Sequence, residues 1–103
     1  MRTLMIVSIP HPTFNAAVKD GTAGAKLKKI LEAQKPEAAY FTELNGKRTG
    51  ILVVNLAEPS QIPALAEPWF LAFDAHVEFC PTMVPADLAK ATADIERAAK
   101  KYA

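Results

Sequence analysis

The chain has 103 residues, of which 50% are hydrophobic and 22% are charged, and its formal net charge is +1. This length predicts a single domain, residues 1–103, and the composition is typical of a globular protein rather than a disordered or fibrous one. The near-neutral charge and the scattered lysines exclude a basic stripe of the kind that binds nucleic acid. A domain of this size buries only about 60–65% of the surface of its unfolded chain, so that a partner subunit would stabilise it.

The cellular compartment is suggested by the only cysteine and by the first residues. A lone Cys80 excludes an internal disulfide and fits a reducing compartment. The opening "MRTLMIVSIPHP" is too short to span a membrane, and His-Pro interrupts the apolar run that a signal peptide requires. We therefore expect a cytoplasmic protein that has no membrane partner.

The N-terminal third predicts a strand followed by a helix. Residues 3–9, "TLMIVSI", are β-branched and apolar on both faces, which is typical of a strand that is covered on both sides. Residues 13–35 have helical spacing, with Thr13 as a candidate cap and Pro36 as the stop. The helical pattern slips near "DGTAG" (20–24), where two glycines break the helix or admit another backbone.

A hairpin is predicted in the middle of the chain. Strands over 38–45 and 47–56 flank Asn45-Gly46, a pair that suits a type I′ turn because both central residues need positive φ. The register set by this turn pairs Leu44 with Lys47, Glu43 with Arg48, Phe41 with Gly50, and Tyr40 with Ile51.

The last part of the chain predicts helix, strand and helix. Ser60 is a candidate cap for a helix that runs to about Asp74, with Pro68 expected to kink or restart it. Residues 76–83 alternate between polar and apolar, which predicts a strand with one polar face, and the proline within it favours an edge position. Asp87 is a candidate cap for a final helix.

The order of these elements is β-α-β-β-α-β followed by a helix, which is the split βαβ, or ferredoxin-like, motif of the α+β class. Its four-stranded antiparallel sheet has the order 4-1-3-2, with the two doubly apolar strands in the centre. Two helices cover one face only, so that Ile51 and Val53 on the other face would be exposed to water. An apolar patch of this size marks an interface, and we expect a homodimer whose open sheet faces pack together or close into a shared barrel.

The stretch "RTGILVVNLAEPSQIPALAEPWFLAFDAHVEFCPTM" resembles small uncharacterised bacterial proteins of the dimeric α/β-barrel superfamily. Gly50, Pro68, Trp69 and Pro81 match the pattern of that group, whereas Asn55 stands where an acidic residue is expected. The wider superfamily includes muconolactone isomerase, cofactor-free monooxygenases and haem degraders. The resemblance implies the dimeric barrel fold but selects none of these activities, because one fold hosts many functions.

The two faces of the sheet have different characters. The expected helix-facing residues are Leu52, Val54, Leu56, Val77 and Phe79. The expected open-face residues are Ser8, Tyr40, Thr42, Ile51, Val53, Asn55, His76, Glu78 and Cys80. An apolar floor with a few polar groups is the usual make-up of a small-molecule pocket. The open face is therefore the predicted site.

Within that pocket, His76 and Glu78 are the candidate catalytic residues, because either side chain can move a proton. Tyr40 and Asn55 would orient the substrate or hold a developing oxyanion. The candidate ligand-binding residues are Tyr40, Thr42, Asn55, Trp69, Cys80 and His11.

Each of these candidates also has an ordinary structural interpretation. His76 suits a solvated turn histidine, and Glu78 suits an ion pair with a cation across the dimer. Cys80 fits a small buried hydrophobe, Trp69 fits the core, and His11 fits a loop residue at the mouth of the first strand.

Two functions follow from this pattern. The first is a cofactor-independent enzyme that acts on a small, partly apolar metabolite, and the alternative is a non-catalytic binding or sensing module. No motif identifies a cofactor, and no metal site is predicted, since His11, His76 and Glu78 are a weak ligand set. RNA binding is disfavoured because 47–56 lacks the stacking aromatic residues of the RNA-binding βαββαβ domains.

Overall fold

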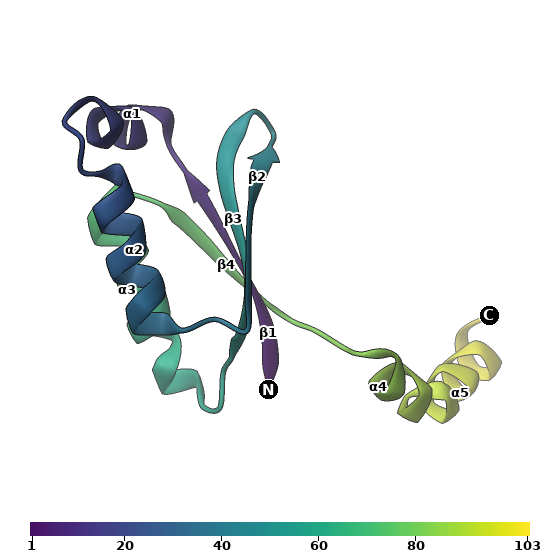
Figure 1. The fold of residues 1–103 in the computed structure, drawn as a ribbon. Helices are drawn as coiled ribbons and strands as arrows, with labels where there is room; N and C mark the ends of the chain where they lie inside the picture. The colour runs from purple at the N-terminus through teal and green to yellow at the C-terminus, as the bar shows by residue number, and fades with distance from the viewer.

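The computed structural model of the protein describes all 103 residues. It has an α+β fold in which three helices cover one face of a four-stranded sheet and two further helices follow at the C-terminus (Figure 1). The elements are β1 (Arg2–Ile9), α1 (His11–Lys19), α2 (Ala23–Gln34), β2 (Ala38–Leu44), β3 (Lys47–Asn55), α3 (Ile62–Phe73), β4 (His76–Pro81), α4 (Pro85–Lys90) and α5 (Thr92–Tyr102). None of these helices has the length and apolar character needed to cross a bilayer.

The sheet is antiparallel throughout and has the order β2-β3-β1-β4. The ferredoxin-like prediction is therefore confirmed, with β1 and β3 in the centre and β4 at an edge. Met5 of β1 lies opposite Leu52 of β3 and Phe79 of β4, which gives one continuous apolar row under the helices. The predicted helix-facing side is confirmed, because Leu52 and Val54 are buried and Phe79 packs against the same core.

The β2–β3 hairpin has the predicted turn and register. Asn45 and Gly46 both have positive φ, 54° and 73°, as a type I′ turn requires. All four expected cross-strand pairs are present. A Cβ at Gly50 would lie 3.1 Å from the ring of Phe41, so that glycine allows this aromatic side chain to lie across β3.

The predicted helix over 13–35 is two helices, because the chain breaks at residues 20–22 between α1 and α2. Gly21 has φ +80°, and the carboxylate of Asp20 accepts hydrogen bonds from the backbone N–H and the hydroxyl of Thr22. Thr13 does not cap the first helix, which already begins at His11. Its hydroxyl instead hydrogen-bonds to the carbonyl of Phe73, which ties α1 to the end of α3.

The second predicted helix begins one residue later than expected, with Gln61 and not Ser60 at its N-cap. Ser60 lies in a short 3-10 turn, Pro59–Gln61, and α3 follows from Ile62. The helix continues through Pro68 and ends at Asp74, which has a left-handed conformation with φ 53°. Of the two expected outcomes at Pro68, a kink or a restart, the restart is absent, because one helix runs from Ile62 to Phe73.

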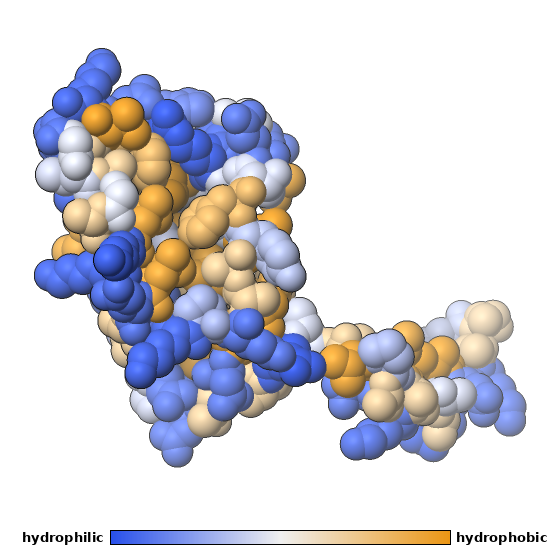
Figure 2. All heavy atoms as spheres, in the orientation of Figure 1, coloured by the Kyte–Doolittle hydropathy of each residue, from blue (hydrophilic) through white to orange (hydrophobic).

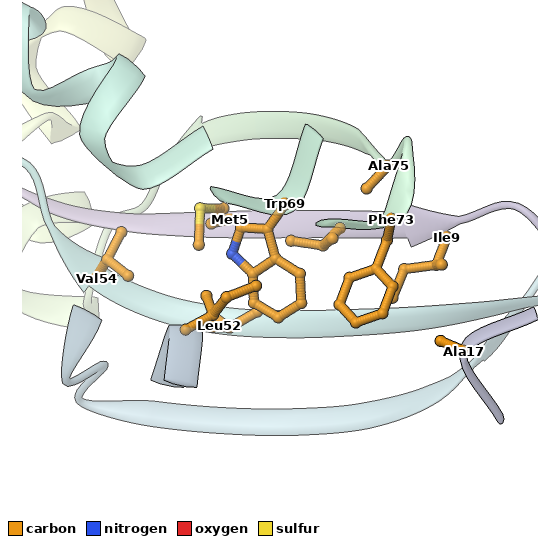
Figure 3. Close-up of a cluster of buried hydrophobic side chains, with 10 residues drawn as sticks. Met5, Ile9, Ala17, Leu52, Val54, Trp69, Phe73 and Ala75 are labelled. Carbon is orange, nitrogen blue, oxygen red and sulfur yellow. The ribbon is translucent and has the colours of Figure 1, made fainter. Parts of the chain in front are cut away.

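The core lies between α3 and the sheet. Trp69 and Phe73 are fully buried, and their rings lie side by side over Met5 and Leu52 (Figure 3). The indole N–H of Trp69 donates a hydrogen bond to the side-chain oxygen of Gln34, at 3.1 Å. The structure therefore places Trp69 in the core and away from the open face of the sheet.

The C-terminal part differs most from expectation. The single helix predicted from Asp87 is two helices, α4 and α5, neither of which has a buried residue. Asp87 does cap α4, but as the third residue of that helix and not as the residue before it. Its carboxylate accepts a hydrogen bond from the backbone N–H of Val84. Both helices project from the body (Figure 1), and the radius of gyration is 17.3 Å, against about 13 Å for a compact domain of this length.

Candidate functional site

The open face of the sheet is the side that no helix covers. Ile6, Ile51 and Val53 are half-buried there, whereas the outer strands expose Tyr40 and Glu78. The strand register orders this face in rows, in which Tyr40 is followed by Ile51, Ile6 and Glu78. The centre of the face is thus apolar and its edges are polar.

A depression of about 430 Å³ lies at one end of this face. It is lined by Ile6, Ser8, Leu44, Asn45, Lys47, Thr49, His76 and Glu78. Ser8 lies opposite both His76 and Thr49, and Ile6 lies opposite Glu78, so that three strands bring these side chains together. The two predicted catalytic residues therefore share one hollow with a hydroxyl and an ammonium group.

Local structure fixes where His76 and Glu78 lie. The left-handed Asp74 ends α3, and the buried Ala75 anchors the chain before β4 begins at His76. His76 and Glu78 are two residues apart on a strand, so both side chains are on the same face with their Cα atoms about 7 Å apart. This spacing leaves room for a small polar group of a ligand to contact both side chains.

The floor and the rim of the depression are differently polar. Thr49 is buried in the floor, where its hydroxyl donates to the carbonyl of Lys47, while Ile6 supplies apolar surface beside it. At the rim, Lys47 offers a positive charge and His76 and Glu78 are exposed. The hollow can therefore hold a small molecule with an apolar part below and a polar or anionic part above.

Three predicted ligand-binding residues lie on the open face but outside the depression. Cys80 follows Glu78 along β4 and lies opposite Leu4. Tyr40 and Thr42 belong to β2, and three strand spacings of about 4.8 Å separate that edge from β4. Within one chain these residues do not converge with His76.

The remaining predicted residues lie elsewhere. Asn55 is at the opposite end of β3, about 20 Å from the row of Ser8 by strand geometry, and its side chain accepts a hydrogen bond from the N-terminal amine. His11 begins α1, and its Nε2 lies 2.9 Å from the carbonyl oxygen of Gly46 in the hairpin turn. His11 thus contacts the turn and does not line the depression.

Sequence reasoning missed several residues that line the hollow, namely Ile6, Leu44, Asn45, Lys47 and Thr49. The signal was available in the hairpin register. Because alternate residues share a face, an open-face Ile51 also places Thr49 and Lys47 there.

No other hollow in the molecule contains a histidine. One of about 350 Å³ has Thr42, Glu43, Arg48 and Thr49 as its polar lining, so Thr42 lines that hollow and not the depression. The largest, of about 600 Å³, lies between α2 and α3, and its polar lining is Lys26, Lys29 and Gln34. No group of three or more His, Cys, Asp or Glu side chains is arranged to hold a metal ion. The depression beside His76 is therefore the best candidate site for chemistry. No protein-family model matches the chain, and no curated protein is significantly similar to it.

Proposed function

We propose that the protein is a homodimer whose open sheet faces pack together around a binding site for a small, partly apolar molecule. The depression that gathers His76, Glu78, Ser8 and Lys47 is the observation that carries this proposal. A second sheet about 10 Å away would cover the hollow and exclude water from it. This arrangement is that of the dimeric α/β barrels, which the sequence resembles.

In this proposal the site supports proton transfer in a cofactor-independent reaction. An imidazole and a carboxylate on one wall are a common acid–base combination, and proton transfer by such groups contributes about 10²–10⁴-fold to rates. His76 or Glu78 removes a proton, and the Lys47 ammonium stabilises negative charge that develops on the substrate. Ile6 and Leu44 hold the apolar part of the substrate.

The proposed dimer would also account for the predicted binding residues that lie far from the depression within one chain. Tyr40, Thr42 and Cys80 lie on the same face as the depression, at distances that one chain cannot close. Facing sheets would bring residues of the second copy opposite the hollow of the first. In that assembly Tyr40 of one chain can contact a ligand held by the other.

The experiment begins with native mass spectrometry of protein purified without denaturation. The proposal predicts twice the chain mass of 11.2 kDa, with any retained ligand released on activation. Small carboxylic acids, lactones and phenols are then screened for thermal stabilisation. Compounds that bind are incubated with the wild type and with His76→Ala and Glu78→Gln. Glu67→Gln, the same chemical change as Glu78→Gln at an exposed residue of α3 outside the hollow, is the control.

An enzyme would be supported if the control retains turnover while both site variants lose it by at least about 10²-fold. Turnover that survives both site variants would refute the assignment of His76 and Glu78. Binding without turnover supports the second candidate function, a binding or sensing module. The observation that favours a binding or sensing module is that His76 and Glu78 are both exposed in the single chain.

A further inference from the structure

The C-terminal arm, residues 82–103, carries an apolar surface that nothing in its own chain covers. Met83, Leu88, Ile95 and Tyr102 are between 51% and 78% exposed. Met83, Leu88 and Ile95 share one hollow of about 580 Å³ on the arm, and Figure 2 shows hydrophobic atoms gathered there. Helices of 6 and 11 residues are marginal in water without tertiary packing. The arm therefore needs a partner surface.

The direction of the arm points to where that partner lies. Figure 1 shows α1, α2 and α3 on one side of the sheet, while the arm leaves on the other side, beside the open face. The backbone N–H and the hydroxyl of Thr82 both donate to the carbonyl of Arg2, which holds the root of the arm against β1. A second copy seated on the open face would therefore lie beside the arm.

That second copy carries a groove of suitable character on its helical layer. The hollow between α2 and α3 is lined by Lys26, Lys29, Ile30, Ala33, Gln34, Ala64, Leu65, Pro68, Leu71 and Ala72. Leu71 stands on this groove with 82% of its surface exposed, although it belongs to the most apolar helix of the chain. Leu71 therefore extends the apolar surface of the groove, and it is the contiguous apolar lining that suits a contact with another apolar face.

We propose that the arm reaches a second copy of this chain and packs its apolar face into that copy's α2–α3 groove, so that the two copies exchange arms. This inference rests on the proposed dimer through the open sheet faces. Three extended residues and 17 helical residues give the arm a reach of at most about 35 Å, the value for α4 and α5 end to end. The far side of a packed second copy is about 20–25 Å away, which is one sheet spacing and one helix diameter.

The area of the interface supports the exchange. Four strands of six to nine residues present a sheet face of about 480 Å² in projection. A stable interface needs about 800 Å² from each partner. One side of α4 and α5 covers about 260 Å², and each copy would both give and receive an arm. The exchange thus brings the buried area of each copy to the range of a stable dimer.

The test compares three substitutions by sedimentation equilibrium. Ile95→Glu charges the apolar face of the arm, and Leu71→Glu charges the groove. Ala93→Glu is the control, because Ala93 is exposed on the opposite side of the same helix. The first two changes are expected to raise the dimer dissociation constant at least tenfold, and the control to leave it within twofold. Far-UV circular dichroism checks that each variant is folded.

A second measurement identifies the contact itself. In a mixture of ¹³C-labelled and unlabelled wild-type chains, isotope-filtered NOE spectra should show cross-peaks between the methyl groups of Ile95 and Leu71 of different chains. Cross-peaks within one chain between Ile95 and Ile51, from an arm folded over its own sheet, would overturn the exchange. So would an unchanged dissociation constant in either Ile95→Glu or Leu71→Glu.

The variant Ile51→Glu tests the proposed open-face dimer separately from the arm exchange. If Ile51→Glu gives monomers while Ile95→Glu and Leu71→Glu remain dimeric, the arm exchange fails and the open-face dimer stands. If the wild-type chain is itself a monomer at high micromolar concentration, both proposals fail. These outcomes separate the two claims.

Discussion

Gln34 joins the helical layer to the core, and Gln34→Leu tests how much this contact stabilises the fold. The Gln34 side chain accepts from the indole N–H of Trp69 at 3.1 Å and donates to the carbonyl of Leu65 at 2.8 Å. Leucine has a similar size but makes neither hydrogen bond. The Trp69 side chain is fully buried, so its N–H would lose its partner in a place where water has little access.

The magnitude follows from the burial of each group. A buried donor without a partner costs about 1–3 kcal/mol. Gln34 itself is half-buried, so water can replace part of the interaction, and we expect Gln34→Leu to lower the free energy of unfolding by about 1–2 kcal/mol. In a Trp69→Phe background the donor is already gone, so the same change should cost about 1 kcal/mol less.

The assay is urea unfolding followed by far-UV circular dichroism, with all four proteins of the cycle at one chain concentration. The concentration is fixed because the stability of a dimer depends on it. A loss below about 0.5 kcal/mol for Gln34→Leu, or additive effects in the cycle, would refute the reasoning. Either result would mean that the Trp69–Gln34 hydrogen bond does not hold α2 against α3.

Further predictions concern the turn, an exposed carboxylate and the dimer. Gly46→Ala should destabilise the hairpin by about 1–2 kcal/mol in the same urea assay, because φ is +73° there. Gly24→Ala in α2, where nothing lies within 4 Å, should instead stabilise by about 0.5–1 kcal/mol. The Thr22 hydroxyl and then its backbone N–H lower the pKa of Asp20, so the stability from this group is present above its unfolded pKa and lost as pH falls through the lower folded value. Thr22→Val should therefore raise that pKa in an NMR titration, and an unchanged value would contradict this cause. Ile51→Glu should give monomers with a native circular dichroism spectrum, whereas a persistent dimer would rule out the open-face contact.

Local patterns were enough to predict the sheet. Asn45-Gly46 defines the hairpin because few residue pairs tolerate two positive φ angles, and the register of β2 and β3 follows from that turn. Alternation along β4 correctly predicted that His76 and Glu78 share the open face. The turn and the alternation are both short-range effects, because the face of the sheet on which a residue lies is set by its position relative to its neighbours in the chain.

Helix boundaries were predicted less well, because caps and breaks depend on distant partners. Thr13 has the side chain of a helix cap, but its hydroxyl bonds instead to the carbonyl of Phe73, 60 residues away. Pro68 was expected to kink or restart α3, and the helix does not restart but runs through it, with the neighbouring Trp69 fully buried in the core. Tertiary packing outweighed the local preference in both cases.

The sequence by itself determined the order of the strands, the apolar core and the face that carries His76 and Glu78. The strand order follows from the succession of elements along the chain, and the core and the face follow from side-chain periodicity and turn chemistry, which act over a few residues. The sequence placed Ser8 on the same face, and the hairpin register placed Lys47 and Thr49 there. Only the tertiary structure, which pairs β1 with both β3 and β4, decided that these side chains surround His76 and Glu78 and that Asn55 lies at the other end of the sheet. It alone also showed the arm leaving its own domain. The physical reason is that an amphipathic helix records in its sequence that it needs an apolar partner, but not where that partner lies.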